Sequence, residues 1–155
     1  MFRRKKDANE KIGDEFADDM VVVVDRSINP YLVLFHESAG FRAEQVRGLR
    51  NRLVAMNPDG EPKTLVVTSA VRGEGKTVSA LNLAMAFAEL ERQSVVLVDA
   101  DLRSPSCERY LNLNSETGLT DVLLGRTPVD KVLRMAGYRN LKLLGAGSRV
   151  DNPAE

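Results

Sequence analysis

The stretch TLVVTSAVRGEGKTVSALNLAMAFAEL, residues 64–90, decides the fold of this chain. It opens with an apolar and β-branched run at 64–69, which predicts a strand. From residue 76 to about residue 92, apolar residues recur at the spacing of a helix. A short loop with two glycines, a lysine and a threonine lies between the two. A strand, a glycine-rich loop and a helix in this order are typical of a site that holds phosphate.

The loop AVRGEGKT, residues 70–77, fits the pattern G-x-x-x-x-G-K-[ST], except that Ala70 replaces the first glycine. Gly73 and Gly75 permit positive φ, so that backbone N–H groups can close around phosphate oxygens. Lys76 supplies a positive charge for the β- and γ-phosphates, and the Thr77 hydroxyl can ligate Mg²⁺. A plain glycine-rich turn is the alternative, which the place of the loop between strand and helix disfavours.

A second element, VVLVDADLRSP at 95–105, combines a buried strand with two acids, Asp99 and Asp101. Ligands of open parallel sheets bind at the carboxyl ends of the strands, where these acids are expected. Two carboxylates near a phosphate loop suit Mg²⁺ coordination and the acceptance of a proton from an attacking hydroxyl. The alternative is a pair of aspartates that only cap the loop.

The rest of the chain supplies further helices and one more strand. A helix is predicted over 39–56, with an apolar stripe and a neighbouring polar face. The stripe consists of Val46, Leu49, Leu53 and Met56, and the polar face of Glu44, Arg47 and Arg50. Short extended pieces are expected at 20–25 and at YLVLF (31–35), short helices at 118–125 and 128–136, and a core strand at 140–147. This alternation predicts an α/β fold, a parallel sheet covered by helices on both faces as a three-layer sandwich.

Composition limits the choice of function. The 155 residues and 43% hydrophobic content suit one domain, and the 22 basic and 22 acidic residues create no global field for nucleic acid. Residues 1–27 read as a disordered, charged N-terminal tail, and residues 28–155 as the domain. We expect no secretory signal and no membrane span, which favours the cytoplasm. Cys107 is expected to be inert, His36 receives no role, and the three tyrosines are expected to be packing residues.

In combination, SAVRGEGKT, VVLVDADLRSP and GLTDVLLG resemble the bacterial tyrosine autokinases (BY-kinases) of capsule and exopolysaccharide synthesis. That family combines a P-loop of the Walker A type with a second aspartate motif, hhhDxDxR. It also has E-x2-R-x2-R on an early helix, which Glu44, Arg47 and Arg50 match, and the closing GAGSRVDNPAE is similar to a family segment. The resemblance covers about residues 28–155 and implies a P-loop NTPase-type fold.

By this resemblance the chain is an ATP-dependent protein-tyrosine kinase that uses Mg²⁺ and acts on itself and on other proteins. Lys76, Asp99 and Asp101 are the implied catalytic residues, and Thr77 and Asp99 the implied metal ligands. Glu44, Arg47 and Arg50 are implied to mediate self-association into a homo-oligomer. The implied nucleotide-binding residues are Val71, Arg72, Gly73, Glu74, Gly75, Lys76, Thr77, Val78 and Arg103. The implied partners are a membrane-bound activator (the polysaccharide co-polymerase) and protein tyrosine substrates, which would place the kinase at the inner face of the membrane.

The sequence departs from the family pattern in three places. Arg72 stands where the family often has proline, either facing solvent or adding a phosphate contact. The C-terminal tyrosine cluster of the family is absent, and so is a Walker B strand. We therefore expect a piece of a longer kinase, in which 64–69 is left as an exposed apolar edge and phosphotransfer by the 155 residues alone is weak or absent.

Two alternative functions stay open. One is a non-catalytic ATP-binding subunit that regulates a polysaccharide export machine. The other is a MinD/ParA-type ATPase, which would need a lysine at the position of Val71.

Overall fold

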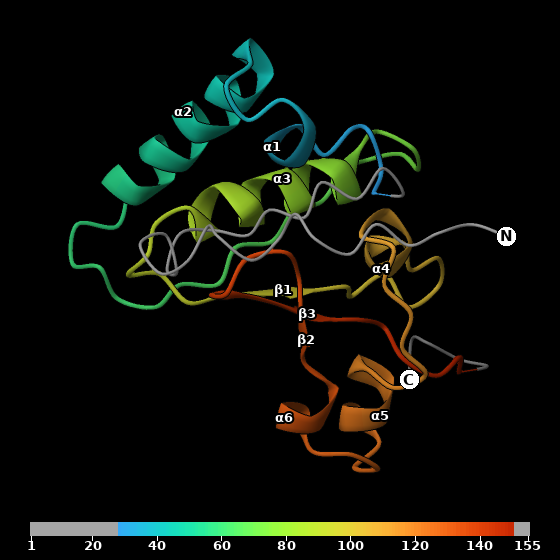
Figure 1. Cartoon of the computed structure of the whole chain (residues 1–155). Helices are drawn as coiled ribbons and strands as arrows, with labels where there is room; N and C mark the ends of the chain where they lie inside the picture. Colours follow the sequence, from blue (N-terminus) through green and yellow to red (C-terminus); the bar gives the residue numbers. More distant parts are fainter. Residues whose placement is uncertain (1–27, 151–155) are drawn as a thin grey trace, which may run out of the picture.

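The computed structural model describes residues 28–150, and the expected extended piece at 20–25 lies outside them. Along the described chain, α1 to α3 come before β1, and α4 to α6 lie between β1 and the strands β2 and β3 (Figure 1). The helices are α1 Val33–His36, α2 Phe41–Ala55, α3 Lys76–Ala88, α4 Cys107–Tyr110, α5 Leu119–Leu123 and α6 Val129–Val132. The strands are β1 Val95–Val98, β2 Arg134–Met135 and β3 Leu141–Leu144. The predicted α/β class is confirmed, and α3 ends earlier than the predicted residue 92.

The sheet has the order β1-β3-β2. β1 and β3 are parallel, with Val95 opposite Leu141 and Leu97 opposite Leu143. The short β2 runs antiparallel to β3. The sheet is therefore mixed, whereas the sequence predicted a parallel sheet. Because β1 and β3 are parallel, their carboxyl ends share one edge of the sheet. Asp99, directly after β1, lies at that edge.

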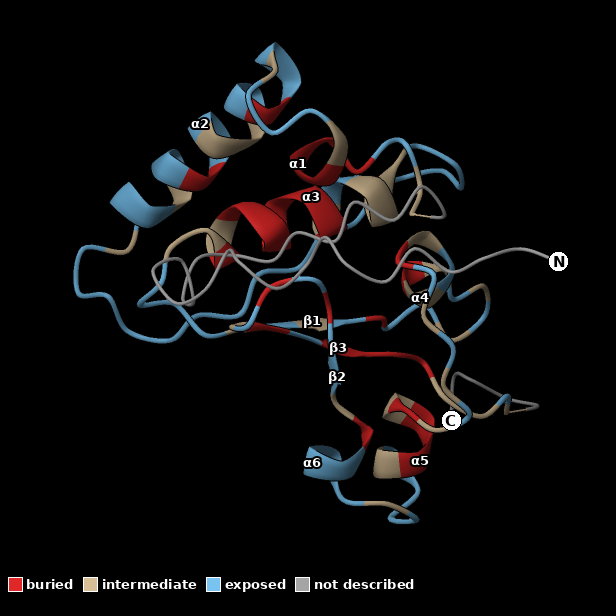
Figure 2. Ribbon diagram, viewed as in Figure 1, coloured by how far each residue is buried: buried red, intermediate tan, exposed pale blue. Residues whose placement is uncertain are grey.

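One face of the sheet is covered and forms the core. Helix α3 packs on this face, and α1 and α2 lie beyond it (Figure 1). Leu81 and Met85 of α3 are fully buried, as are Leu141 and Leu143 of β3 (Figure 2). On the opposite face of β1, Val96 and Val98 alternate with the covered residues and stay exposed. The three-layer arrangement is therefore incomplete over β1.

The segment YLVLF was predicted to be extended, and this is wrong. Asn29 starts a turn, because its side-chain oxygen accepts a hydrogen bond from the Tyr31 amide at 3.0 Å and its carbonyl accepts one from the Leu32 amide at 3.0 Å. The one-turn helix α1 follows and buries Leu32 and Leu34 against α3. Helical geometry is favoured here because it sends consecutive apolar residues into the same core.

Residues 64–69, predicted to form the strand before the loop, are not a strand of the described sheet. Leu65 is 54% exposed and Val66 77% exposed, so the apolar run faces solvent. A strand needs a neighbour that supplies N–H and C=O groups, and here β1 is paired only with β3. The expectation that this segment is left exposed is confirmed.

Helix α2 confirms the helix predicted over 39–56, but the predicted stripe is wrong at two of its positions. Leu49 is 49% exposed and Met56 is 80% exposed. Ala43 and Arg50 are the buried residues of α2, because the face with Arg47 and Arg50 packs against α3. The two arginines of the polar face therefore face the protein, and Glu44 stays exposed.

The tyrosines differ from one another. Tyr138 is buried beside Phe35, with ring centroids 6.0 Å apart, and burial raises its pKa to about 12. Tyr110 is half-buried, in line with a packing role. Tyr31 is 63% exposed, so the packing role expected for it is wrong. Within residues 28–150, no helix has the length and apolar character needed to cross a membrane.

Candidate functional site

The predicted phosphate loop leads directly into α3, which begins at Lys76. Gly75 caps the helix with φ 89°, and Gly73 has φ 89° as well. Side chains rarely adopt this left-handed region, so glycine is required at both positions by conformation. A Cβ at either position would meet no heavy atom within 4 Å, so the space beside the loop is open. Open space beside a glycine-rich turn is what the close approach of phosphate oxygens needs.

The amides at the start of α3 suit an anion. Gly75 makes no side-chain cap hydrogen bond, and the 13-residue helix has no acid in its first turn. The first N–H groups of a helix have no partner within the helix and carry a partial positive charge. Lys76 adds its ammonium group at the same end. The donor set of amides and one lysine therefore fits a phosphate chain.

Within the loop, the Val71 amide donates a hydrogen bond to Glu74 Oε2 at 3.1 Å. The Ser69 hydroxyl donates to the Val71 carbonyl at 2.9 Å. Val71 and Arg72 are both exposed, and Val78 is half-buried on α3. A carboxylate thus occupies one of the amides that the sequence assigns to phosphate.

Asp99 is the buried acid of the pair. Its Oδ2 accepts hydrogen bonds from the amides of Ser106 at 2.8 Å and Cys107 at 2.9 Å, and its Oδ1 accepts one from the Asp101 amide at 3.2 Å. Each carboxylate oxygen can accept about two bonds, so Oδ1 keeps capacity for a cation or its water. Asp101 is exposed, and its Oδ1 accepts from the Ser104 amide at 3.1 Å.

A hydroxyl pair joins the loop to this acid. Thr77 Oγ1 lies 2.9 Å from Ser106 Oγ, and the amide of Ser106 is bonded to Asp99. The structure thereby brings together Thr77 and Asp99, the two predicted metal ligands, through a residue that the sequence analysis missed. No described contact joins Arg103, which is exposed, to the loop.

The described residues contain no group of three or more His, Cys, Asp or Glu side chains arranged for a metal. Mg²⁺ commonly takes one or two protein carboxylates, with phosphate oxygens and waters as its other ligands. Thr77, Asp99 and Asp101 offer oxygen ligands of this kind. When bound, Mg²⁺ would neutralise charge that develops on the transferred phosphate.

Cys107 lies at the start of α4 and is buried. Burial raises the pKa of its thiol well above the usual range, and the negative charge and hydrogen bond of Asp99 raise it further. The thiolate is the reactive form of cysteine, so this thiol is held in its unreactive form. The structure agrees with the expectation of an inert residue.

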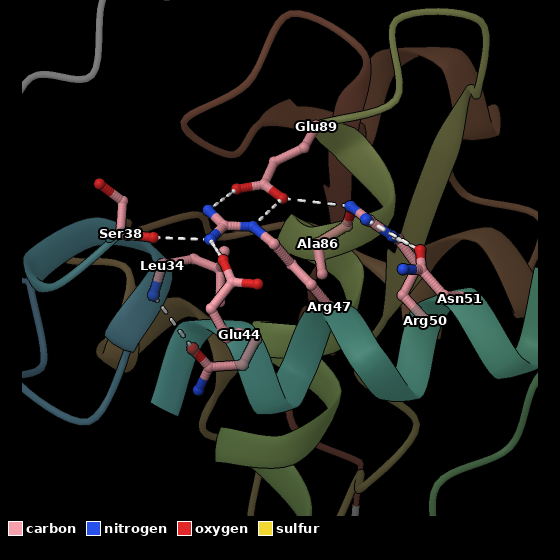
Figure 3. Close-up of polar contacts among 9 residues, drawn as sticks. Leu34, Ser38, Glu44, Arg47, Arg50, Asn51, Ala86 and Glu89 are labelled. Atoms are coloured by element: carbon pink, nitrogen blue, oxygen red, sulfur yellow. Dashed lines mark hydrogen bonds and ion pairs between the residues drawn. The ribbon is translucent and has the colours of Figure 1, made fainter. Parts of the chain in front are cut away.

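The two arginines of the E-x2-R-x2-R pattern join α2 to the C-terminal end of α3, and Glu44 contacts Arg47 within α2 (Figure 3). Arg47 donates to both carboxylate oxygens of Glu89, at 2.8 Å from Nε to Oε2 and 2.5 Å from Nη2 to Oε1. Arg50 Nη1 donates to the Ala86 carbonyl at 2.8 Å and to Glu89 Oε2 at 3.1 Å. Glu44 pairs with Arg47, and its side chain is 61% exposed.

In this chain, therefore, both arginines are engaged within the protomer. The partner Glu89 at the end of α3 was missed in the sequence analysis. The self-association role of this helix stays a prediction, with Glu44 as its most accessible member.

The GLTDVLLG motif, residues 118–125, is hydrogen-bonded to the segment that follows β3. Asp121 is buried, and its Oδ2 accepts from the amides of Gly118 at 2.9 Å and Ser148 at 3.2 Å. Ser148 also donates its hydroxyl to Asp121 Oδ1 at 2.8 Å. These bonds, with Gly118 first, hold the pKa of Asp121 below its usual value. The role of this aspartate is to fix α5 against residues 145–148.

The chain is similar to known proteins over most of its length. Tyrosine-protein kinase YwqD of Bacillus subtilis (strain 168) is 34% identical over 124 residues, which is 80% of this chain and 52% of the relative. Tyrosine-protein kinase etk of Escherichia coli (strain K12) is 30% identical over 126 residues, which is 81% of this chain and 17% of the relative. The chain thus spans about half the length of the Bacillus protein. No model of a known protein family matches the chain.

Solved structures give the same result. The kinase domain of Escherichia coli tyrosine kinase ETK superposes with a TM-score of 0.74 at 28% identity, over 84% of this chain and 50% of that one. The chimerical protein CapA2B2 superposes with a TM-score of 0.71 at 28% identity, over 81% and 56% of the two chains. Over most of its length, therefore, this chain is related in sequence and in fold to bacterial tyrosine-protein kinases.

Proposed function

We propose that this chain binds ATP with Mg²⁺ and forms the nucleotide half of a kinase that phosphorylates protein tyrosines. The observation that carries the proposal is the pairing of an open glycine loop with the buried Asp99 across the Thr77–Ser106 contact. Kinase relatives that match over most of this chain support it. The chain spans about half of the Bacillus relative. The activity of a whole kinase is therefore proposed for this chain and is not carried over from the comparison.

In the proposed reaction the tyrosine hydroxyl oxygen attacks the γ-phosphorus. The bond from that phosphorus to the β,γ-bridging oxygen breaks, and ADP leaves with the electron pair. Lys76 and the loop amides stabilise the phosphate oxygens, and Asp101, exposed at the edge of the sheet, accepts the proton of the hydroxyl. Thr77 and Asp99 hold Mg²⁺, and the protein contributes mainly position and charge.

The test is transfer of radiolabelled γ-phosphate to tyrosine by the chain, alone and together with the purified activator protein. Lys76→Met and Asp101→Asn are the variants, and circular dichroism checks that both fold. With the activator present, wild type is expected to form phosphotyrosine, and both variants are expected to lose this product. Unchanged transfer by Lys76→Met would refute the assignment.

A second candidate is an ATP-binding subunit without turnover. It is favoured by residues 64–69, which feed the loop yet belong to no described sheet. This candidate predicts ATP binding with neither phosphotyrosine nor released phosphate. A measurable rate of either product would exclude it.

Partners follow from the family. We propose a membrane-bound polysaccharide co-polymerase as activator, protein tyrosines as substrates, and self-association in which Glu44 takes part. This assigns the chain to the inner face of the membrane, in the regulation of capsule or exopolysaccharide synthesis. Co-purification with the activator tests the proposed activator. A comparison of wild type with Glu44→Ala tests whether Glu44 takes part in self-association.

A further inference from the structure

We propose that Ser106 is a positioning residue for the magnesium ligand Thr77, an inference that rests on the proposed function. Thr77 Oγ1 and Ser106 Oγ lie 2.9 Å apart, which is hydrogen-bond distance for two hydroxyls. The two residues come from different elements, since Thr77 is on α3 and Ser106 precedes α4. Their contact joins the glycine loop to the residue that follows the aspartate motif, and the amide of that residue is bonded to Asp99.

Ser106 is held from both sides. Its amide donates to Asp99 Oδ2 at 2.8 Å, and the next amide, of Cys107, donates to the same oxygen at 2.9 Å. Its carbonyl accepts from the Tyr110 amide at 3.1 Å. Asp99 is fixed in turn, because its amide donates to the Leu144 carbonyl of β3 at 2.9 Å. The Ser106 hydroxyl is therefore anchored to the sheet.

This anchor matters because of what a hydroxyl does at a metal. A hydroxyl that gives a lone pair to a cation can no longer accept freely, and its proton needs an acceptor. Threonine has a choice of side-chain rotamers in a helix, because its hydroxyl can also bond to the preceding turn. With Ser106 Oγ as acceptor, Thr77 directs its proton toward α4 and keeps its lone pairs for the cation. Removing a residue that orients a metal ligand, without touching the metal itself, typically changes metal affinity by about 10–100-fold.

A purely structural tether between loop and helix would act differently. It would change nucleotide binding with and without metal to the same extent, because it would act on the shape of the loop. A positioning role acts only when the metal is present. The two roles therefore separate in a magnesium titration.

The experiment uses the fluorescent nucleotide mant-ADP with the full chain. Its affinity is measured in EDTA and then over a series of Mg²⁺ concentrations, for wild type, Ser106→Ala and Ser106→Thr. Ser104→Ala is the matched control, a serine two residues earlier in the same loop. We expect Ser106→Ala to raise the half-saturating Mg²⁺ concentration by about tenfold or more, with the EDTA affinity unchanged. Ser106→Thr, which keeps a hydroxyl, and Ser104→Ala are expected to follow wild type.

Three results would overturn the inference: a wild-type Mg²⁺ response in Ser106→Ala, an equal loss with and without Mg²⁺, or a Ser106→Thr variant that behaves like Ser106→Ala. Failure of the proposed function looks different. In that case wild type itself binds no mant-ADP in either condition, and the inference falls with it.

Discussion

Replacing Glu89 by alanine removes the acid that joins α2 to α3. Glu89 accepts two hydrogen bonds from Arg47 and one from Arg50, and its side chain is only 16% exposed. The two arginine side chains are 20% and 10% exposed. The substitution therefore leaves two largely covered guanidinium groups without their main anion, in addition to removing three charge-assisted bonds.

The magnitude lies between two limits. An exposed ion pair contributes about 0–1 kcal/mol, and removal of one partner from a buried pair costs about 3–5 kcal/mol. Ser38, Ala86 and Asn51 still accept bonds from the arginines, and water reaches part of the cluster, so the cost falls below the upper limit. We expect a loss of about 2–3 kcal/mol in the free energy of unfolding. For a domain of this size that corresponds to a fall in Tm of about 8–12 °C.

Urea unfolding followed by circular dichroism measures this loss, with differential scanning fluorimetry for Tm. Glu91→Ala is the matched control, because Glu91 is an exposed acid two residues further on. We expect the control to stay within about 0.5 kcal/mol of wild type. If Glu89→Ala and Glu91→Ala are equally stable, the contact between α2 and α3 does not depend on this acid, and the structural role of Arg47 and Arg50 is refuted.

Further predictions concern stability, reactivity and solubility. Asp121→Asn should lose about 1–3 kcal/mol at pH 7. The native pKa of Asp121 is lowered, so its stabilising effect is present above the ordinary pKa of 3.8 and is lost as pH falls through the native value. In urea titrations the difference from wild type should therefore shrink as the pH falls below 3.8; a constant difference would contradict this. Cys107 should resist thiol reagents in the native protein at pH 8 and react once guanidinium unfolds it, and fast native labelling would contradict its raised pKa. Val66→Lys should reduce aggregation in sedimentation experiments, because it places a charge in an exposed apolar segment; unchanged aggregation would show that residues 64–69 do not cause it.

The sequence predicted those parts of the structure that depend on local pattern. The loop and its glycines, the helix after it and the two parallel strands follow from spacing and turn chemistry, and all are present. Asp99 was expected at the carboxyl end of a strand and lies there, because parallel strands place their ends on one edge.

Features that depend on tertiary partners were missed. The stripe with Leu49 and Met56 has the correct period, but pairing with Glu89 turns the arginine face of α2 inward. YLVLF has strand-forming residues, yet burial against α3 favours a helical turn. Residues 64–69 have strand propensity and no described neighbour to pair with. Ser106 lies outside the sequence motifs, so its place beside Thr77 is known only from the contact between their hydroxyls.

The central claim is that residues 70–77 bind the phosphates of ATP together with Mg²⁺. Calorimetric titration of ATP into wild type and Lys76→Met, each with Mg²⁺ and with EDTA, tests it most directly. We predict saturable binding by wild type that Mg²⁺ strengthens, and a loss of about 10–100-fold in Lys76→Met, since a hydrogen bond from a charged group contributes about 1.5–3 kcal/mol. Binding without any dependence on Mg²⁺, or equal affinity in Lys76→Met, would contradict the claim.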